Sequence, residues 1–405
     1  MENKNKKNTK NNIKKEYIKK SKKYVANTYA RFDLLLESGN GSKLKDTDGK
    51  EYIDLGSGIG VNSLGYNNKN WIKNITNQLN KLQHTSNLYY NKPYIELAEK
   101  LCNITKFDKV FFSNSGAEAN EAAIKCARKY SFVKYGKDAK RYNIVSLKNS
   151  FHGRTMATIS ATGQDVFHNF FFPFLEGFLF AEANNLEDTI SKLKNNSCAI
   201  IMELVQGEGG VIPLNKEYVA SVREYCEKND ILMIVDEVQT GAGRTGKFLC
   251  SEHYNLKADI ITLAKGLGGG LPIGATLMNK KCSDTFTAGD HASTFGANPI
   301  VCAGALEILK NIDKNFLKEI SKKGKYIKDN LIKLDNVKNV DGIGLMLGIE
   351  LKEGLNAREI VEKCISKGII PLTAKNKIRL LPPLNISQKD LEKAIRILSE
   401  VLKLY

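Results

Sequence analysis

Residues 231–240 have the sequence ILMIVDEVQT, and residues 259–270 have the sequence DIITLAKGLGGG. In each stretch a short apolar run is followed by a polar residue, Asp236 in the first and Lys265 in the second. Short, fully apolar runs are typical of strands that are buried on both faces of a parallel sheet. The two stretches therefore predict two such strands, with a carboxylate and an amine at their carboxyl ends.

The surrounding sequence predicts an α/β fold. Between residues 108 and 280, further apolar runs (Val110–Phe112, Ile144–Ser146, Cys198–Met202) alternate with helical patterns (Glu118–Tyr130, Leu186–Leu193, Lys216–Lys228). This alternation indicates a large domain with a mostly parallel sheet flanked by helices on both faces. Beyond about residue 300 longer helical patterns and a few strand-like runs follow, which predict a second, smaller α+β domain.

The net charge and the cysteines exclude several classes of protein. The chain has 405 residues and a formal charge of +17, but ten lysines and two glutamates in residues 1–23 account for +8 of it. We expect these residues to form a flexible basic tail and expect no nucleic acid partner. No stretch approaches the roughly 20 apolar residues of a membrane span, so we expect no membrane association. The eight cysteines lie at least twenty residues apart, which argues against a metal site or a disulfide framework and favours a cytoplasmic location.

Small residues follow the run Val110–Phe112 and precede the helical pattern that starts at Glu118. The sequence Ser113-Asn114-Ser115-Gly116-Ala117 fits a phosphate-binding turn, because backbone N–H groups and the positive end of the helix dipole face an anion there. An ordinary strand–helix turn with Ser115 as N-cap explains the same residues. Taken alone, this motif favours the ordinary turn over the phosphate site.

Asp236 and Lys265 are each open to two interpretations as well. Asp236 fits either a partner for a cationic ring nitrogen of a cofactor or a structural ion pair. Lys265 fits either a partly buried amine suited to Schiff-base chemistry or a surface lysine beside a flexible turn. The nearby Gly241–Gly246 matches the dinucleotide-binding pattern GxGxxG, but no strand directly precedes it, so we reject that function.

A phosphate-binding turn, a strand-end Asp and a strand-end Lys in one sheet match the requirements of pyridoxal phosphate. Six motifs then occur in a recognisable order: NSGAEAN (114–120), FHGRT (151–155), ELVQGEG (203–209), DEVQTGAGRTG (236–246), LAKGLGGGLPIGA (263–275) and STFGANP (293–299). They resemble the class III, fold type I pyridoxal-phosphate aminotransferases from about Tyr24 to the C-terminus. The resemblance implies an N-terminal segment (24–58) that joins the small domain (301–405), beside a large cofactor-binding domain (59–300).

The resemblance also implies roles for individual residues around the cofactor. Lys265 would bind pyridoxal phosphate and move protons, and Asp236 would pair with the ring nitrogen. Gln239 would hydrogen-bond the ring hydroxyl, and Phe151 would stack on the ring beside His152. The phosphate would be held by four residues, the last of them from a neighbouring subunit, which implies a homodimer with shared active sites: Ser115, Gly116, Ala117 and Thr294.

Substrate specificity is expected to depend on arginines, because a guanidinium binds a carboxylate through two parallel hydrogen bonds. Arg154 resembles the family arginine that binds a substrate carboxylate. Arg379 resembles the arginine that takes the α-carboxylate of glutamate or 2-oxoglutarate, and Glu208 the residue that masks it during the amine half-reaction. Tyr29 and the segment 84–90 (HTSNLYY) resemble the acetylornithine branch, and Ser293 is expected near that substrate.

We therefore expect an aminotransferase that moves the δ-amino group of N2-acetylornithine to 2-oxoglutarate, in arginine biosynthesis. The tyrosine that ornithine-specific members place in the turn at Ser57-Gly58-Ile59 is absent, which favours an acylated donor. The alternatives are an ω-aminotransferase for ornithine, succinylornithine or 4-aminobutyrate. More distant alternatives are an aminomutase of the same fold and a basic nucleic-acid-binding protein without enzymatic activity.

Overall fold

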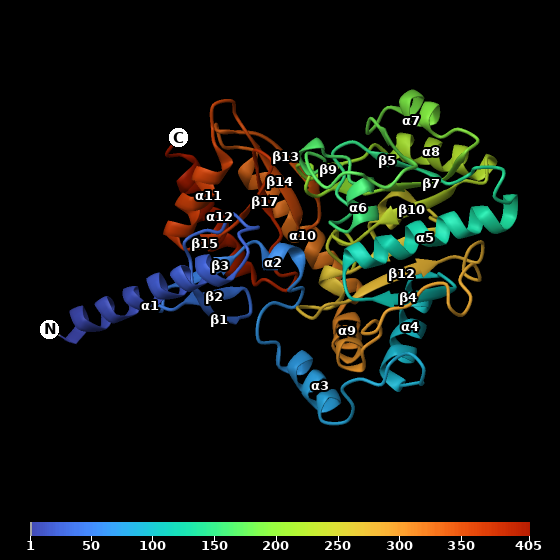
Figure 1. Ribbon diagram of the computed structural model, residues 1–405. Helices are drawn as coiled ribbons and strands as arrows, with labels where there is room; N and C mark the ends of the chain where they lie inside the picture. The colour runs from blue at the N-terminus through green and yellow to red at the C-terminus, as the bar shows by residue number, and fades with distance from the viewer. Residues whose placement is uncertain (1) are drawn as a thin grey trace.

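A seven-stranded sheet forms the centre of the large domain (Figure 1). The computed structural model describes residues 2–405, with side chains from residue 13 onward. The strands follow in the order β4 (Lys109–Ser113), β12 (Gly274–Met278), β11 (Ile260–Leu263), β10 (Leu232–Asp236), β7 (Ser197–Met202), β5 (Asn143–Leu147) and β6 (Phe178–Ala181). All neighbouring pairs are parallel except the two that include β12. The mostly parallel sheet that we predicted is thus present.

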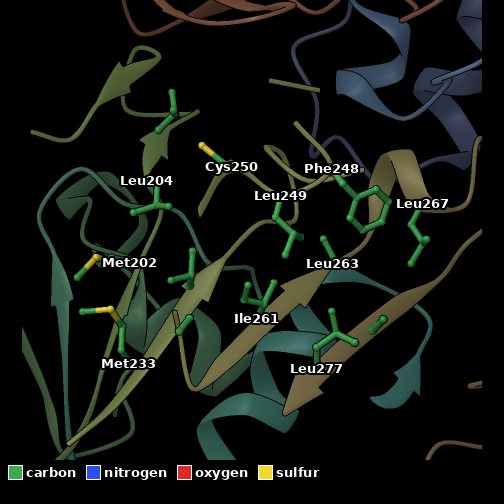
Figure 2. Packing of buried hydrophobic residues seen from close by; sticks show 14 of the residues in the cluster. Met202, Leu204, Met233, Phe248, Leu249, Cys250, Ile261, Leu263, Leu267 and Leu277 are labelled. Atoms are coloured by element: carbon green, nitrogen blue, oxygen red, sulfur yellow. The ribbon is translucent and has the colours of Figure 1, made fainter. Parts of the chain in front are cut away.

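The strands are buried on both faces, which explains why their sequences are continuously apolar. Met202 and Met233 lie in the larger core cluster on one face, together with Leu204, Leu263 and others shown in Figure 2. The alternate residues Ile201 and Ile234 belong to a separate cluster, with Ala123 and Cys126 of helix α5, on the other face. Each strand therefore contributes side chains to two cores.

Most helices of the large domain cover this sheet, whereas α3 packs on α9. The helices are α3 (Lys69–Leu79), α4 (Lys92–Thr105), α5 (Gly116–Tyr135), α6 (Met156–Ala161), α7 (Leu186–Lys192), α8 (Lys216–Lys228) and α9 (Pro299–Asn311). We placed the domain boundary at residue 300, but α9 packs on α3 and α4. Its Cys302, Ala305 and Leu309 belong to the core of the large domain, so that core extends through this helix.

The small domain contains two four-stranded sheets. In one, β1 (Leu36–Asn40), β2 (Lys43–Asp46) and β3 (Glu51–Asp54) continue into β15 (Ile369–Ile370), so segments from both ends of the chain share a sheet. The other has the order β13 (Val337–Ile343), β14 (Met346–Leu351), β17 (Lys377–Leu380) and β16 (Leu372–Ala374). Helices pack against them around a separate apolar core: α10 (Lys314–Leu331), α11 (Ala357–Lys367) and α12 (Gln388–Leu402).

The basic N-terminal segment, for which we predicted a flexible tail, is helical in the structure. Helix α1 spans Glu2–Tyr24 and leads away from the small domain (Figure 1). Its Tyr17 and Tyr24 are exposed, and helices without packed faces are only marginally stable in water. The flexibility of this segment in solution stays a prediction. None of the described helices is long and apolar enough to cross a membrane.

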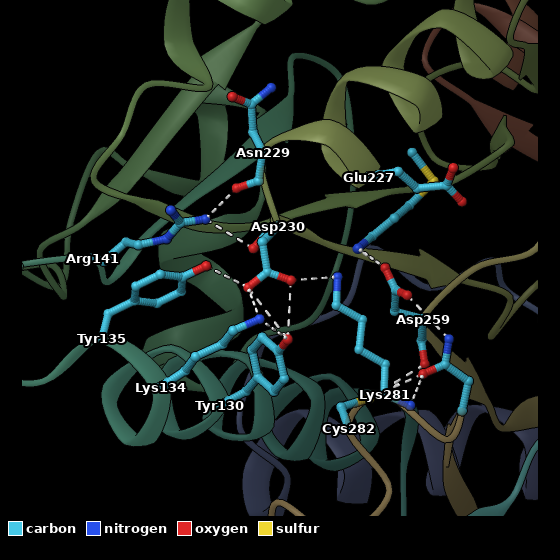
Figure 3. A network of polar contacts seen from close by, with 12 residues as sticks. Tyr130, Lys134, Tyr135, Arg141, Glu227, Asn229, Asp230, Asp259, Lys281 and Cys282 are labelled. Carbon is cyan, nitrogen blue, oxygen red and sulfur yellow. Dashed lines mark hydrogen bonds and ion pairs between the residues drawn. The ribbon is translucent and has the colours of Figure 1, made fainter.

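Helix α5 is fixed at its C-terminal end by the carboxylate of Asp230, which precedes β10. Figure 3 shows this carboxylate surrounded by Tyr130, Lys134 and Tyr135 of α5 and by Lys281. The Tyr135 hydroxyl and the Lys134 ammonium donate to it over 2.6 and 2.8 Å. Burial alone would raise the pKa of Asp230, but these hydrogen bonds hold it well below its ordinary value. The ionised carboxylate therefore fixes the C-terminal end of α5 to the sheet at the amino end of β10.

Candidate active site

A cavity of about 480 Å³ lies at the carboxyl ends of the parallel strands, where open α/β sheets bind their ligands. It collects ten of the residues that we singled out in the sequence. They come from the segments that follow β4, β5, β7, β10 and β11: Ser115, Gly116, Ala117, Phe151, His152, Arg154, Glu208, Asp236, Gln239 and Lys265. A volume of this size is within the range of small-molecule sites.

Asp236 ends β10 and has hydrogen-bond donors on both carboxylate oxygens. His152 Nδ1 and Asn120 Nδ2 each lie 2.8 Å from Oδ2, and the Val238 N–H donates to Oδ1 over 3.0 Å. The residue is only 3% exposed. Hydrogen bonds from several donors offset the cost of burying a carboxylate and fix its orientation. His152 Nε2 is buried and has no partner among the described residues.

Lys265 follows β11 and opens the short 3₁₀ helix η3 (Lys265–Leu267). Its φ of 41° lies in the left-handed region, which non-glycine residues rarely adopt and which is often found at functional sites. Burial lowers the pKa of its amine below the ordinary value, and the charge of Glu208 opposes this shift. The next residue, Gly266, allows Ser63 to pack closely against the backbone, because a Cβ on Gly266 would lie 2.7 Å from Ser63 Oγ.

The turn before α5 has the N-cap that its sequence allowed, and its geometry is compatible with a phosphate site as well. The Ser115 hydroxyl accepts the N–H of Glu118 over 3.2 Å, so Ser115 is the N-cap. The N–H groups of Gly116 and Ala117 stand in the first turn, where a helix offers no internal acceptors. Both residues line the cavity. A Cβ on Gly116 would lie 2.6 Å from Val238 Cγ1, so glycine keeps this turn close to the strand end.

Arg379 reaches the site from the small domain, on β17. Its side chain is 4% exposed, and Nη1 donates to Glu208 Oε1 over 2.6 Å. The same nitrogen lies 3.4 Å from Gln239 Oε1 and from the carbonyl oxygen of Gly207. Arg379 Nε is buried without a partner among the described residues. Glu208 thus occupies the guanidinium edge that a substrate carboxylate would need.

These observations agree with the comparisons to known proteins. A family model described as aminotransferase class-III matches residues 24–402. The chain belongs to the class III aminotransferases. Enzymes of this family depend on pyridoxal phosphate.

Individual relatives cover nearly the whole aminotransferase. The acetylornithine aminotransferase of Haemophilus ducreyi is 50% identical over 380 residues, which are 94% of this chain and 96% of the relative. The crystal structure of N-acetylornithine aminotransferase from Stenotrophomonas maltophilia K279a has 31% identity and a TM-score of 0.83, and covers 96% of this chain and 98% of that one. The ornithine aminotransferase of Toxoplasma gondii ME49 has 28% identity and a TM-score of 0.92, with 96% and 95% covered. The predicted fold type is confirmed.

The residues of this aminotransferase fit the cofactor of its family. The cavity offers an amine at Lys265, a buried carboxylate at Asp236 and free N–H groups at the start of α5. These three lie on adjoining strand ends of one sheet, since β10 pairs with β11 and β4 is separated from β11 only by β12. The unpartnered His152 Nε2 is a further sign that the polar groups of the site are arranged for a ligand.

Two residues of the aminotransferase that the sequence reasoning missed support this arrangement. Asn120, one turn into α5, donates to Asp236 and accepts from Thr262 Oγ1 over 2.8 Å. Glu203, directly after β7, accepts the N–H groups of Phe151 and Gly207 over 2.7 and 2.8 Å. Burial raises the pKa of Glu203 to about 7. The strand-end rule that pointed to Asp236 and Lys265 also applies to Glu203.

Four of the residues that we singled out do not line the cavity: Arg379, whose guanidinium pairs with Glu208 at the edge of the cavity, and three others. Ser293 lies at its margin, where its hydroxyl accepts from Asn114 Nδ2 over 3.0 Å. Thr294 is exposed beside it, and Tyr29 is 70% exposed. The roles of all three at the active site stay predictions. No group of three possible metal ligands occurs in the part of the chain that the structure describes.

Proposed function

We propose that this aminotransferase binds pyridoxal phosphate and moves the δ-amino group of N2-acetylornithine to 2-oxoglutarate. The products are N-acetylglutamate semialdehyde and glutamate. The observation that carries the proposal is the single cavity that holds Lys265, Asp236 and Arg154, with Arg379 behind Glu208 at its edge. The 50% identity to the acetylornithine aminotransferase of Haemophilus ducreyi supports this donor.

Besides Lys265, six residues of the same subunit would contact the phosphate and the ring of the cofactor. The first turn of α5 would bind its phosphate through the Gly116 and Ala117 N–H groups and the Ser115 side chain. Asp236, Gln239 and Phe151 would contact its ring. When bound, pyridoxal phosphate supplies an aldehyde that captures amines and a ring that accepts the electrons released at the carbon bearing the amine.

The carboxylate of Asp236 would hold the cationic ring nitrogen. Its contacts with His152 and Asn120 fix its orientation, which supports this role. Lys265 would hold and move a proton at Nζ, between the substrate carbon that bears the amine and the cofactor carbon bonded to the same nitrogen. Because burial lowers the pKa of its amine, more of the amine is neutral near pH 7 and able to accept a proton.

The two arginines would orient the substrates. Arg154 would bind the carboxylate of N2-acetylornithine, which places the δ-amino group toward Lys265. Arg379 would bind the α-carboxylate of 2-oxoglutarate after Glu208 moves aside. The 2.6 Å pair between Arg379 and Glu208 supports a masked state in which one pocket accepts an ω-amine.

Ornithine is the second candidate donor, because the fold matches the Toxoplasma gondii ornithine aminotransferase with a TM-score of 0.92. The wall of the cavity nearest the Ser57–Ile59 turn is formed by Val61, an apolar residue. The turn has no tyrosine, and its one hydroxyl, on Ser57, does not line the cavity, so neither would meet a free α-amino group. The apolar wall favours the acetylated donor over ornithine. The similarity to an acetylornithine aminotransferase favours the acetylated donor over succinylornithine and 4-aminobutyrate.

We also propose a homodimer in which Thr294 contacts the phosphate site of the second copy. Exposed apolar side chains surround Thr294: Phe295 is 62% exposed, and Leu88 and Tyr90 are 86% and 91% exposed. Asn87 Nδ2 donates to the carbonyl oxygens of Ser293 and Gly296, so the two loops form one surface beside the cavity. A second copy would cover this surface. We also propose that the enzyme is located in the cytoplasm.

A panel of amino donors tests the proposed function. Purified enzyme is supplied with pyridoxal phosphate and 2-oxoglutarate, and glutamate formation is measured with N2-acetylornithine, ornithine, succinylornithine and 4-aminobutyrate. We expect the highest kcat/KM for N2-acetylornithine. A higher value for ornithine would reassign the donor, and no glutamate with any donor would overturn the proposal.

A further inference from the structure

Arg154, the proposed ligand of the substrate carboxylate, is held by aromatic rings rather than by an acid. Its side chain is exposed to the cavity, and no ion pair joins it to any side chain described from residue 13 onward. Its guanidinium carbon lies 4.0 Å from the ring centre of Phe167 and 5.6 Å from that of Phe151. Cation–π contacts of this kind attract a guanidinium to the face of a ring.

Phe167 also touches the aromatic residue proposed to stack on the cofactor. The rings of Phe167 and Phe151 meet edge to face, with centres 5.7 Å apart and planes at 70°. One side chain, Phe167, therefore contacts both Phe151 and Arg154. It lies thirteen residues after Arg154 in the chain, on the 3₁₀ helix η1 (Asp165–Phe167).

The turn that carries Phe167 is fixed on both sides. Before it, Gln164 Nε2 donates to the Ser150 carbonyl oxygen over 3.1 Å, next to Phe151. After it, His168 Nε2 lies 2.9 Å from the carbonyl oxygen of Ile159 in α6. Phe167 is half-buried, whereas Phe170 beyond the turn is 69% exposed. The ring of Phe167 is thus positioned by the fold.

We propose that Phe167 is a positioning residue that sets the preference of this site for substrates with a carboxylate; this rests on the proposed function. A stacked guanidinium keeps the N–H groups at its edge free, so they can form two hydrogen bonds with a carboxylate. An acidic partner for Arg154 would instead compete with the substrate. Phe167 therefore orders Arg154 without occupying it.

The consequence is a selective loss when the ring is removed. Phe167→Leu keeps an apolar side chain but removes the ring face. KM for N2-acetylornithine should rise by about 2- to 30-fold, the range that a cation–π contact supports, while kcat changes less. A primary alkylamine of similar length has no carboxylate, so its rate should stay unchanged. Phe167→Tyr keeps the ring and should behave like the wild type.

The experiment uses the enzyme loaded with pyridoxal phosphate. For wild type, Phe167→Leu and Phe167→Tyr, KM and kcat are measured with N2-acetylornithine and with n-pentylamine. The dissociation constant of glutarate, an unreactive dicarboxylate, is measured by calorimetry as a readout independent of turnover. Phe170→Leu is the matched control, because its ring lies in the same loop without a contact to Arg154.

A double-mutant cycle with Arg154→Ala decides the mechanism. If Phe167 acts through Arg154, Phe167→Leu should have no further effect on KM or on glutarate binding in the Arg154→Ala background. An equal effect in both backgrounds, or an equal loss for the acid and the amine, would overturn the inference. Wild-type enzyme without any activity toward N2-acetylornithine would contradict the proposed function instead, and glutarate binding would still test the stacking.

Discussion

Replacing Glu208 with glutamine should make Arg379 more available to carboxylates. In the structure Arg379 Nη1 donates to Glu208 Oε1 over 2.6 Å, in a site where the arginine side chain is 4% exposed. A glutamine side chain of the same length can still offer an oxygen there, but without the charge. The substitution therefore weakens the contact that an incoming α-carboxylate would displace under the proposed role of Arg379.

The expected size follows from the two kinds of hydrogen bond. A bond to a charged partner contributes about 1.5–3 kcal/mol, and a neutral one about 0.5–1.5 kcal/mol. The difference of about 1–1.5 kcal/mol corresponds to a change in affinity of about 5- to 13-fold. KM for 2-oxoglutarate should fall by about this factor in Glu208→Gln. The kcat/KM for the δ-amine donor should fall, because Glu208 no longer neutralises the Arg379 guanidinium, which then repels the cationic amine.

Stopped-flow measurement of the two half-reactions separates the effects, with N2-acetylornithine for one and glutamate for the other. Glu224→Gln is a suitable control, since Glu224 forms a 2.7 Å pair with Lys228 on the exposed side of α8. It should change neither half-reaction. If Glu208→Gln binds 2-oxoglutarate no better than wild type while remaining folded, Glu208 does not compete for Arg379 and the reasoning is wrong.

Three further predictions concern other parts of the molecule. Lys265→Ala should lose the cofactor absorbance on desalting and at least about 100-fold in turnover; normal turnover would contradict the role of Lys265. Arg244→Met should lower the free energy of unfolding by about 3–5 kcal/mol in urea titrations, because it leaves the buried Asp54 carboxylate without the charge of the buried guanidinium. Adding Asp54→Asn to this variant should restore part of the lost stability. Burial raises the pKa of Glu237 to about 7, so its proton stabilises the fold below about pH 4.5 and this stability is lost as the pH rises through 7. Between pH 5 and 8 wild type should lose about 3 kcal/mol more than Glu237→Gln, and equal slopes would refute this assignment.

Residues at strand ends were predictable because their positions follow from a simple rule of topology. The apolar runs that end at Asp236 and Lys265 are buried on both faces, so the sequence marked both the strands and the edge at which the cavity lies. The orientation of β12 was not predicted. The connection from Leu263 to Gly274 is too short for a helical crossover, which a parallel strand would need, and β12 accordingly runs antiparallel.

Contacts between distant segments left no pattern in the sequence. Arg379 meets Glu208 only because two domains pack together, and without the family resemblance it would pass for a surface arginine. Phe167 contacts Arg154 across a loop with no periodicity. Strands β1 to β3 are polar, short and partly exposed, so their sequences lack the apolar signal of the central sheet.

The anchor at Asp230 has a consequence for engineering the enzyme. Helix α5 has 20 residues, so about 30 Å separate its first turn, the proposed phosphate site, from the tyrosines that hold its last turns. A rigid helix transmits a tilt at one end to the other. Substitutions of Tyr135 or Lys134 on the surface could therefore tune how long the enzyme retains its cofactor, while every residue that meets the substrate stays unchanged.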